Sequence, residues 1–335
     1  MATLQHNLKT GARGIQWCDA TLNPVGGCLH DCKWTMPDGT IAHCYAKDVA
    51  ERGPAAGNYK QGFAAHYWRP NALREMAAAG PPQLIFIDSM SDLMGHWVPE
   101  DQVRTVLQTM PAGGHNVFQM LTKNPRRYLK FLDDLPFNGW VGASSAPNFM
   151  MGRELTPHQQ ERYMHVALET LTAVRERTGR IVWMSIEPLS WDVAGIISQY
   201  PALDWVIVGA ASSGRKYFQP DARHVDRLLD ALDAQGAAVF FKGNIAGLFD
   251  AYDFGSEAKN RWREDFPVRP VPGSPYDGPA PAVAPAPAVV RRQRLARQHG
   301  WTLNTFLPET AAAAEPEART AGATAARPAQ PSLFG

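Results

Sequence analysis

The sequence predicts an α/β fold of the barrel type, and two regularities support this prediction. Six short apolar segments, rich in β-branched and aromatic residues, are bounded by polar residues or glycine, as is typical of buried strands. They occupy residues 84–87, 117–121, 140–143, 181–186, 205–208 and 238–241. Helical patterns fall between or beside them, at residues 101–110, 125–132, 157–178 and 222–235. Strands and helices that alternate along a chain favour a parallel sheet covered by helices.

A further strand is expected at residues 14–17, before the cysteines described below. Seven strands with intervening helices fit a partial or complete TIM-like (β/α) barrel. In such barrels the loops at the carboxyl ends of the strands build the active site. A doubly wound sheet is the alternative, because the spacing of the segments alone does not separate the two.

The composition changes near residue 255 and divides the chain into two parts. Residues 1–255 are predicted to form the barrel domain. Residues 256–335 are rich in proline and alanine, with a short helical pattern at 291–300. Such a segment cannot bury enough apolar surface to fold alone, so we expect a mostly disordered tail.

The bulk composition is that of a globular protein, with 45% hydrophobic residues, 19% charged residues and a net charge of +1. Bulk charge therefore does not indicate a polyanion-binding protein. The first residues lack the pattern of a signal peptide, and no segment approaches the roughly 20 apolar residues that span a bilayer. We expect a cytoplasmic protein with reduced thiols and no membrane partner.

Three of the four cysteines, Cys28, Cys32 and Cys44, lie close together after the first expected strand and before a helical pattern at 45–51. In a reducing compartment this clustering favours a metal or cluster site over a disulfide. Three thiolates can hold an iron–sulfur cluster and leave one iron open to a further ligand.

A structural zinc site is the alternative for the same cysteines, and inert thiols are a third interpretation. Zinc prefers four ligands, so one more would be needed. The candidates for it are Cys18, His30 and His43. Cys18 on its own is expected to be a buried thiol.

Polar side chains follow the predicted strands, where they would meet at one end of the barrel. These candidate binding residues are Asp88, Ser89, Ser91, Lys123, Ser144, Glu187 and Lys242. Serine and aspartate oxygens can accept hydrogen bonds from an ammonium group, and lysine can bind a carboxylate or phosphate. Structural roles compete, since an aspartate such as Asp92 can cap a helix and a lysine can pair with Glu187.

An aromatic–basic cluster lies further along the chain, before Pro70. It consists of His66, Tyr67, Trp68 and Arg69. Such a cluster could stack a nucleobase, but packing of a loop over the barrel is the favoured interpretation.

The segment 17–28, followed by Cys44-Tyr45-Ala46, resembles the phage-associated three-cysteine-motif family of radical-SAM-like proteins. Further similar segments follow in order at residues 88–93, 118–125, 140–144, 185–189, 203–209 and 240–242. The resemblance covers about residues 14–250. The usual radical SAM loop is C-x₃-C-x₂-C, whereas eleven residues separate Cys32 from Cys44 here. Pro37 and Gly39 predict a turn that loops out and returns Cys44 to the site.

This resemblance implies a function for the site residues. The three cysteines would hold a 4Fe–4S cluster whose open iron chelates S-adenosylmethionine, with the strand-end residues as cofactor contacts. An electron from an external donor would then release a 5′-deoxyadenosyl radical that abstracts hydrogen from an unknown substrate. The family's link to mobile elements suggests nucleic acid or a nucleotide as substrate, and a three-cysteine-motif partner protein. A catalytically inactive barrel that acts as an interaction module is the alternative.

The end of the chain contains a short motif that begins at Gln330 and has two adjacent apolar anchors, Leu333 and Phe334. It resembles the peptide by which many bacterial DNA-processing proteins bind the replication sliding clamp. A partner that buried Leu333 and Phe334 would gain roughly 1.5–3 kcal/mol per side chain before ordering costs. We therefore expect a sliding clamp as a possible partner.

Overall fold

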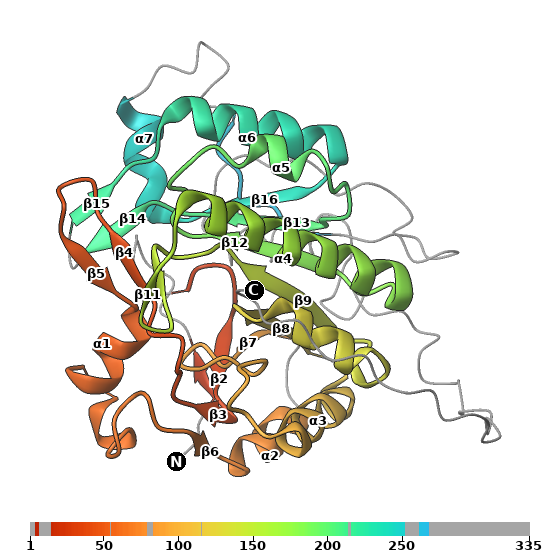
Figure 1. Ribbon diagram of the computed structural model, residues 1–335. Coiled ribbons are helices and arrows are strands. Elements are labelled where there is room, and N and C mark those ends of the chain that lie inside the picture. Colours follow the sequence, from red (N-terminus) through yellow and green to blue (C-terminus); the bar gives the residue numbers. More distant parts are fainter. Residues whose placement is uncertain are drawn as a thin grey trace.

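The computed structural model describes residues 4–6, 15–53, 55–78, 83–114, 116–213, 216–251 and 261–267. Its central feature is an eight-stranded sheet in the order β1-β2-β7-β8-β9-β12-β13-β16 (Figure 1). Only the edge strand β1 (Gln5–His6) pairs antiparallel; the other seven strands run parallel and curl into a half-barrel. The parallel strands follow one another in chain order without a reversal, so the fold is a partial barrel and not a doubly wound sheet.

The six apolar segments predicted as strands all form strands of this sheet. The parallel strands are β2 (Ala20–Leu22), β7 (Leu84–Ile87), β8 (Val117–Thr122), β9 (Gly139–Ser144), β12 (Val182–Ile186), β13 (Trp205–Val208) and β16 (Ala238–Phe241).

The prediction of a first strand at residues 14–17 is wrong, because pairing begins only at Ala20, opposite Ile85. Asp19 fixes this starting point. Its backbone N–H donates to the carbonyl of Leu84 over 2.8 Å, and its carboxylate accepts the N–H of Leu84 over 2.8 Å.

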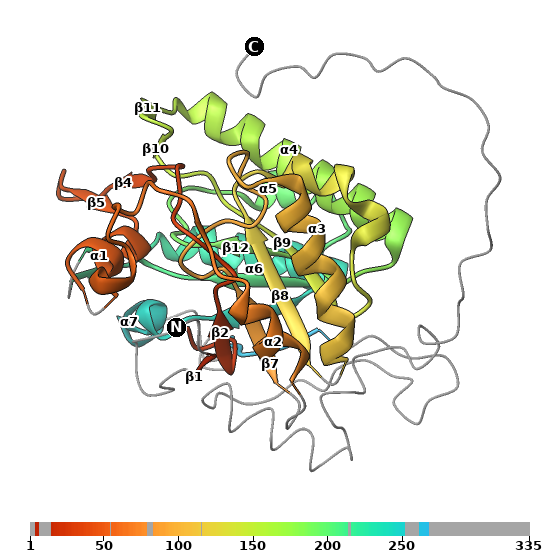
Figure 2. The same ribbon diagram turned by 90° about the horizontal axis from the view of Figure 1, so that it is seen from below.

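The longer helices pack on the outer face of the half-barrel (Figure 2). The longer ones are α3 (Glu100–Thr109), α4 (Pro157–Thr178) and α6 (Ala222–Gln235). Helix α4 begins with a capping box between Thr156 and Gln159 and ends at Gly179, whose φ is +66°. These are the start and stop signals expected of a helix. The shorter helices are α1 (Tyr45–Glu51), α2 (Asn71–Ala77), α5 (Ala194–Ile197) and α7 (Ala246–Ala251).

In the part of the chain that the structure describes, five segments form short 3₁₀ helices. They are η1 (Ala56–Asn58), η2 (Met110–Gly113), η3 (Pro125–Lys130), η4 (Leu132–Asp134) and η5 (Gly243–Ile245). The helical pattern predicted at residues 125–132 is thus two 3₁₀ turns rather than one α-helix.

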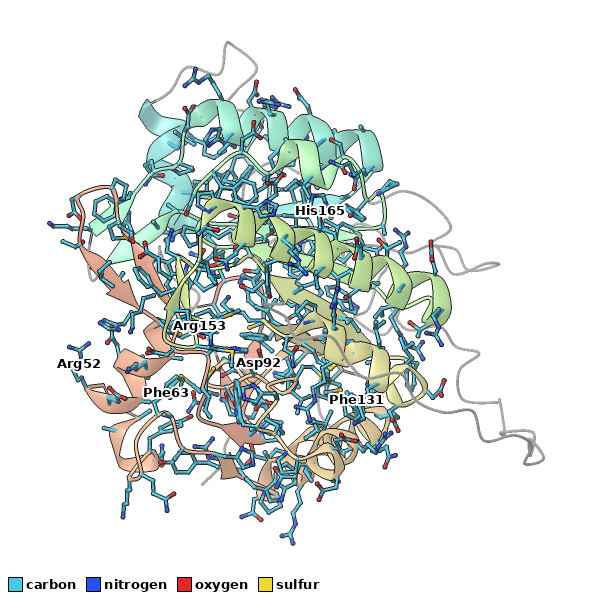
Figure 3. The ribbon with its side chains drawn as sticks, in the orientation of Figure 1. Arg52, Phe63, Asp92, Phe131, Arg153 and His165 are labelled. Carbon is cyan, nitrogen blue, oxygen red and sulfur yellow. The ribbon has the colours of Figure 1, made fainter. Side chains whose placement is uncertain are left out.

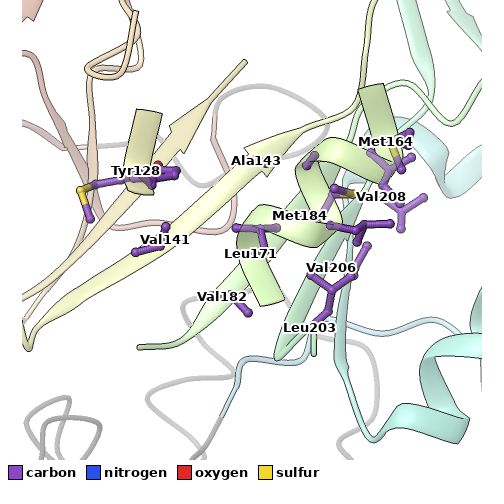
Figure 4. Close-up of a cluster of buried hydrophobic side chains, with 14 of the residues drawn as sticks. Tyr128, Val141, Ala143, Met164, Leu171, Val182, Met184, Leu203, Val206 and Val208 are labelled. Carbon is purple, nitrogen blue, oxygen red and sulfur yellow. The ribbon is translucent and has the colours of Figure 1, made fainter. Parts of the chain in front are cut away.

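The outer face of the sheet forms the larger hydrophobic core. Every second strand residue points to this face, as Figure 4 shows for β9, β12 and β13 against α4. The labelled residues of this core include Val141, Ala143, Met164, Leu171, Val182, Met184, Val206 and Val208.

The inner face is filled toward the amino ends of the strands by an aromatic plug. Its members are Trp17, Phe86, Trp140, Trp183, Trp205, Phe240 and Phe266. The ring centroid of Trp205 lies 5.4 Å from that of Trp183 and 5.6 Å from that of Trp140. Gly142 makes room for this packing, because a Cβ there would stand 2.3 Å from the Trp183 ring.

The segment 261–267 covers the outer edge of the last strand, β16. The N–H of Phe241 donates to the carbonyl of Arg263, and the N–H of Asp265 donates to that of Val239, each over 2.8 Å. Phe266 enters the aromatic plug against Trp205. This segment lies beyond residue 255; the rest of the predicted tail, with Gln330, Leu333 and Phe334, falls outside the described residues.

Small antiparallel pairs stand at the carboxyl ends of the parallel strands (Figure 1). The hairpin β4 (Lys33–Thr35)–β5 (Ile41–His43) and the hairpin β10 (Phe149–Met150)–β11 (Arg153–Glu154) join in one four-stranded sheet. The other pairs are β3 (Val25–Gly26) with β6 (Tyr67–Trp68) and β14 (Ala211–Ser213) with β15 (Lys216–Phe218). Among the described residues, none of the helices has the length and apolar character needed to cross a membrane.

Candidate functional site

The inward positions above the aromatic plug form what we call the mouth of the half-barrel. Side chains alternate along a strand, so Ser144 shares its face with Trp140, and Glu187 shares its face with Trp183. By the same alternation, five predicted site residues continue the inward rows. They are Asp88, Lys123, Ser144, Glu187 and Lys242.

The cysteine loop follows β2 and β3 and enters the mouth through Gly27. Gly27 has a φ of +82°, and a Cβ there would lie 1.8 Å from the carbonyl oxygen of Ala65. Only glycine fits such a conformation and approach. The next residue, Cys28, is held by its N–H, which donates to the carbonyl of Phe63 over 2.8 Å.

The β4–β5 hairpin returns Cys44 to Cys32, as the turn residues predicted. Lys33 pairs with His43, and just outside this pair the N–H of Cys44 donates to the carbonyl of Cys32 over 3.1 Å. The turn contains Gly39, with a φ of +79°. The eleven intervening residues are therefore a hairpin that separates the two cysteines in sequence but not in space.

None of the four cysteines forms a disulfide bond with another. Burial raises the pKa of Cys32 to about 12, while the Lys123 ammonium opposes this shift and the neighbouring Cys44 adds to it. Burial also raises the pKa of Cys28, with Asp92 and Cys32 contributing, and that of Cys44. The three thiols thus influence one another electrostatically. Among the described residues, no three His, Cys, Asp or Glu side chains are already arranged around a common metal position.

The fourth-ligand candidates differ in their surroundings. Cys18 is fully buried beside the aromatic plug, with its Sγ 3.9 Å from the carbonyl of Ile15, so it is the buried thiol that was expected. His43 is exposed on β5. His30 is buried, its Nε2 lies 2.8 Å from Asp92, and its Nδ1 has no hydrogen-bond partner among the described residues.

Asp92, which Figure 3 labels, connects the cysteine loop to strand β8 through its hydrogen bonds. Its buried carboxylate contacts His30 and accepts hydrogen bonds from Thr122 Oγ1 over 2.9 Å and from the N–H of Lys123 over 2.8 Å. Burial alone would raise the pKa of Asp92, but the interactions with His30, Lys123 and Thr122 lower it below the usual value. The predicted helix cap is wrong, because α3 begins only at Glu100; sequence reasoning missed the actual role because its partners are distant in the chain.

Asp88 is buried at the end of β7 in a left-handed conformation, with a φ of +57°. One carboxylate oxygen accepts the N–H of Val25 over 2.9 Å; the other is buried with no hydrogen-bond partner among the described residues. Burial raises the pKa of Asp88 well above its usual value, and the Val25 N–H opposes this shift. Asp88 is therefore a candidate to receive a further donor.

The two serines after β7 have partners within the protein. Ser91 Oγ donates to the carbonyl of Gly27 over 2.6 Å, which ties it to the cysteine loop. Ser89 Oγ donates to Asn23 Oδ1 over 3.3 Å, and its carbonyl accepts from Tyr45 Oη over 2.6 Å. Ser91 thus holds the cysteine loop, and Ser89 is bound to Asn23 and to Tyr45, the residue that follows Cys44.

Lys123 is the ammonium group on the cysteine side of the mouth. Its Nζ donates to Ser144 Oγ, lies 3.4 Å from the carbonyl of Ser145, and stands 5.8 Å from the centre of the Trp34 ring on the hairpin. It also lowers the pKa of both Cys32 and Cys44. The structure therefore brings Lys123, Ser144 and two cysteines together.

Glu187 and Lys242 form a separate ion pair on the far side of the mouth. The register places Gly209 between them on β13, and a Cβ there would lie 3.2 Å from Glu187 Cγ and 3.3 Å from Lys242 Cδ. Ser185 Oγ also donates to Glu187 over 3.3 Å. This pair lies on strands β12 and β16, away from the strand that carries Lys123.

Comparison with protein families gives a match over residues 12–263 to the family described as "Protein of unknown function (DUF5131)". The chain belongs to this family. Comparison with curated proteins gives no match.

Among solved structures, the chain is similar to spore photoproduct lyase complexed with dinucleoside spore photoproduct. The two share 11% identity with a TM-score of 0.44, over 67% of this chain and 77% of that one. A mutant of that lyase with bound AdoMet and dinucleoside spore photoproduct gives 9% identity and a TM-score of 0.44, over 67% and 76%. Similarity at this level decides nothing about the chemistry of the present chain.

Proposed function

We propose that this protein is a radical-SAM-like enzyme that holds a 4Fe–4S cluster on Cys28, Cys32 and Cys44 and binds S-adenosylmethionine beside it. The observation that carries the proposal is the hydrogen bond from the N–H of Cys44 to the carbonyl of Cys32. This bond supports the proposal because it brings Cys44 back to Cys32 despite the unusual spacing, beside a parallel half-barrel of the kind whose strand ends carry active sites.

The donor set suits the cluster. Three thiolates can bind three irons and leave the fourth open, and no disulfide joins the cysteines. Metal binding would deprotonate the thiols despite their raised pKa, because thiolates are the binding form. When bound, such a cluster supplies the electron that cleaves S-adenosylmethionine, and the cleaved cofactor supplies the hydrogen-abstracting radical.

The chain's own residues have distinct roles in this proposal. Lys123 and Ser144 lie beside the cysteine loop and suit a carboxylate group, since an ammonium and a hydroxyl both donate. Asp88, with a free oxygen, suits a donor such as an ammonium group. Glu187 and Lys242 face the same mouth from the other side, and Ser89 and Ser91 support the loop. The aromatic plug excludes water from below, which protects a reactive intermediate.

Anaerobic reconstitution with iron and sulfide tests the cluster. We expect about four irons and four sulfides per chain and a brown protein. Alanine at Cys28, Cys32 or Cys44 should abolish iron uptake, while Cys18→Ala, a buried thiol outside the loop, should retain it. Stoichiometric zinc with no iron uptake by the wild-type chain would contradict the proposal.

Chromatography of reaction mixtures tests the cofactor. The reduced, iron-loaded protein should convert S-adenosylmethionine slowly to 5′-deoxyadenosine and methionine, and Lys123→Met should weaken cofactor binding more than Lys242→Met. A fully loaded, reduced protein that neither binds nor cleaves the cofactor would remove the radical SAM assignment.

A zinc-stabilised, non-catalytic binding module is the second candidate, and His30 favours it. A metal-ligating histidine usually donates its other ring nitrogen to a carboxylate. His30 contacts Asp92 in this way and has a second, unpartnered nitrogen. Zinc that is retained by the wild-type chain and lost in His30→Ala would support this candidate over the cluster.

We also propose a cytoplasmic location, an association with phage or another mobile element, an external electron donor and a partner protein of the three-cysteine-motif type.

The terminal motif, with Gln330, Leu333 and Phe334, would dock the chain on the sliding clamp. Such docking would favour a nucleic acid or nucleotide substrate. The peptide covering residues 321–335, labelled for fluorescence anisotropy, should bind purified clamp in the micromolar range. Binding that persists in a Leu333→Ala, Phe334→Ala double variant would contradict this docking.

A further inference from the structure

A second layer of residues lies directly behind the first part of the cysteine loop. The two-residue strand β3 pairs with β6, so that Val25 faces Trp68 and Gly26 faces Tyr67. The next residue, Arg69, donates its backbone N–H to the carbonyl of Pro24 over 2.9 Å. Arg69 is thereby fixed against the segment that leads to Cys28.

The Arg69 guanidinium occupies the space in which a side chain at residue 26 would stand. A Cβ on Gly26 would lie 2.0 Å from Nη1 and 2.6 Å from Cζ of Arg69. The guanidinium also lies over two tyrosine rings, 4.9 Å from the centre of Tyr59 and 5.5 Å from that of Tyr67. Such cation–π contacts stabilise a partly buried cation.

The tyrosines connect this arrangement to the cysteines. Tyr59 belongs to a small buried cluster with Phe63, against which Cys28, Cys44 and Tyr67 pack. The guanidinium therefore contacts the cluster of buried residues against which two of the three cysteines pack.

Two buried polar atoms remain unmatched at this place. Arg69 Nη2 and one carboxylate oxygen of Asp88 each lack a hydrogen-bond partner among the described residues. Arg69 lowers the pKa of Asp88, but burial raises this pKa by more. The other oxygen of Asp88 holds the N–H of Val25. Strand β3 thus contacts both groups, because the carboxylate accepts the N–H of Val25 and the guanidinium packs against Gly26.

We propose that Arg69 is a positioning residue of the cysteine site, which sets the position of the Gly26–Cys28 segment and places a positive charge behind it. The proposal rests on the proposed function for its electrostatic part. A fixed cation close to an iron–sulfur cluster stabilises the reduced, more negative state, so it raises the reduction potential. Two members of the aromatic–basic cluster, Tyr67 and Arg69, therefore support the cysteine loop in this proposal.

The test compares Arg69→Met and Arg69→Lys with Arg74→Met, an exposed arginine on α2, as matched control. In the metal-free chain, iodoacetamide labelling of Cys28, located by mass spectrometry, should be about tenfold faster in Arg69→Met, because the loop opens locally more often. Labelling of Cys18 should not change. Gly26→Ala should have the same effect as Arg69→Met, since it displaces the guanidinium without removing it, and it serves if Arg69→Met does not fold.

In the iron-loaded protein, a potentiometric titration followed by electron paramagnetic resonance should give a lower reduction potential for Arg69→Met. Arg69→Lys, which keeps the charge, should retain the wild-type potential. Unchanged Cys28 labelling in both Arg69→Met and Gly26→Ala would overturn the positioning role. Equal potentials in all three proteins would overturn the electrostatic role. A wild-type chain that takes up no iron refutes the proposed function, while the labelling experiment still decides the position of the loop.

Discussion

The lower and upper halves of the inner face use the same strands for opposite purposes. Toward the amino ends, the inward positions carry the aromatic plug, whose members are almost fully buried and contact one another. Two or four residues further along the same strands, the inward positions carry Ser144, Ser185 and Glu187. The alternation along each strand determines only which residues point inward. The inward side chains change from aromatic to polar along the strands, so the amino end is closed by packing and the carboxyl end is open to ligands.

The two sides of the mouth differ in how their polar groups are paired. On the cysteine side, His30 and Asp88 each have a buried polar atom with no partner among the described residues. On the far side, Glu187 and Lys242 satisfy each other. Buried polar groups in proteins are nearly always hydrogen-bonded, so the unmatched atoms mark where a ligand or water completes the structure.

The largest loss of stability is expected from removing a side chain at the centre of the aromatic plug. Trp205 is fully buried at the centre of the plug and contacts five other aromatic rings of it. Trp205→Ala should lower the free energy of unfolding by about 3–5 kcal/mol, because it leaves a large cavity. Urea unfolding measures this change. Tyr217→Ala, at an exposed aromatic residue, should change it by no more than about 0.5 kcal/mol, and equal losses in both variants would refute the assignment of the plug.

A smaller loss is expected in the polar half from Asp92→Asn. The amide cannot accept all the hydrogen bonds that the carboxylate accepts, so buried donors on His30, Thr122 or Lys123 lose their partner. The expected cost is about 2–3 kcal/mol at neutral pH. Asp48→Asn, at an exposed helix pair with Arg52, should cost less than about 0.5 kcal/mol.

The carboxylate of Asp92 also predicts that the free energy of unfolding depends on pH. The pKa of Asp92 is lower in the folded state than its unfolded value of about 3.9. Its contribution to stability is therefore complete above that value and is lost as the pH falls through the lower, folded pKa. The difference in unfolding free energy between wild type and Asp92→Asn should shrink in this acidic range. A difference that stays constant down to the lowest pH would show that Asp92 is not ionised in the folded protein.

Gly142→Ala tests how closely the strands pack at the boundary between the aromatic plug and the mouth. The added methyl group meets the Trp183 ring at 2.3 Å, so the plug has to shift at a cost of about 1–3 kcal/mol. Gly57→Ala is the matched control, since a Cβ there meets nothing within 4 Å. Thermal unfolding should show a loss for the first variant and no loss for the second. Similar unfolding temperatures in both variants would contradict the close packing.

The smallest effect is expected from Lys242→Met. The ion pair with Glu187 is partly exposed, with side-chain exposures of 22% and 18%, and Ser185 remains as a partner of the carboxylate. The expected loss is below about 1 kcal/mol. Cys28 labelling by iodoacetamide should not change either, because the pair lies on different strands from the cysteine loop. A marked change in that labelling would show that the two sides of the mouth are coupled.

The sequence was informative where a signal is local. Apolar runs located six of the seven parallel strands, and their polar ends located Lys123, Ser144 and Glu187. Pro37 and Gly39 indicated the turn that returns Cys44. The first strand was misplaced because its limit is set by Asp19 and Leu84, which are distant in the chain. The roles of Asp92 and Arg69 were not identified for the same reason. Asp92 contacts His30 and Thr122, and Arg69 contacts Gly26, all of which are distant in the chain.

The segment 261–267 has a consequence for the solubility of the protein. Its backbone covers the edge of β16, and Phe266 fills the end of the barrel. A chain that stopped at residue 255 would expose an unpaired strand edge next to an aromatic surface, which is the arrangement that promotes edge-to-edge aggregation. Residues 261–267 therefore oppose self-association of the barrel, independently of the chemistry at the mouth.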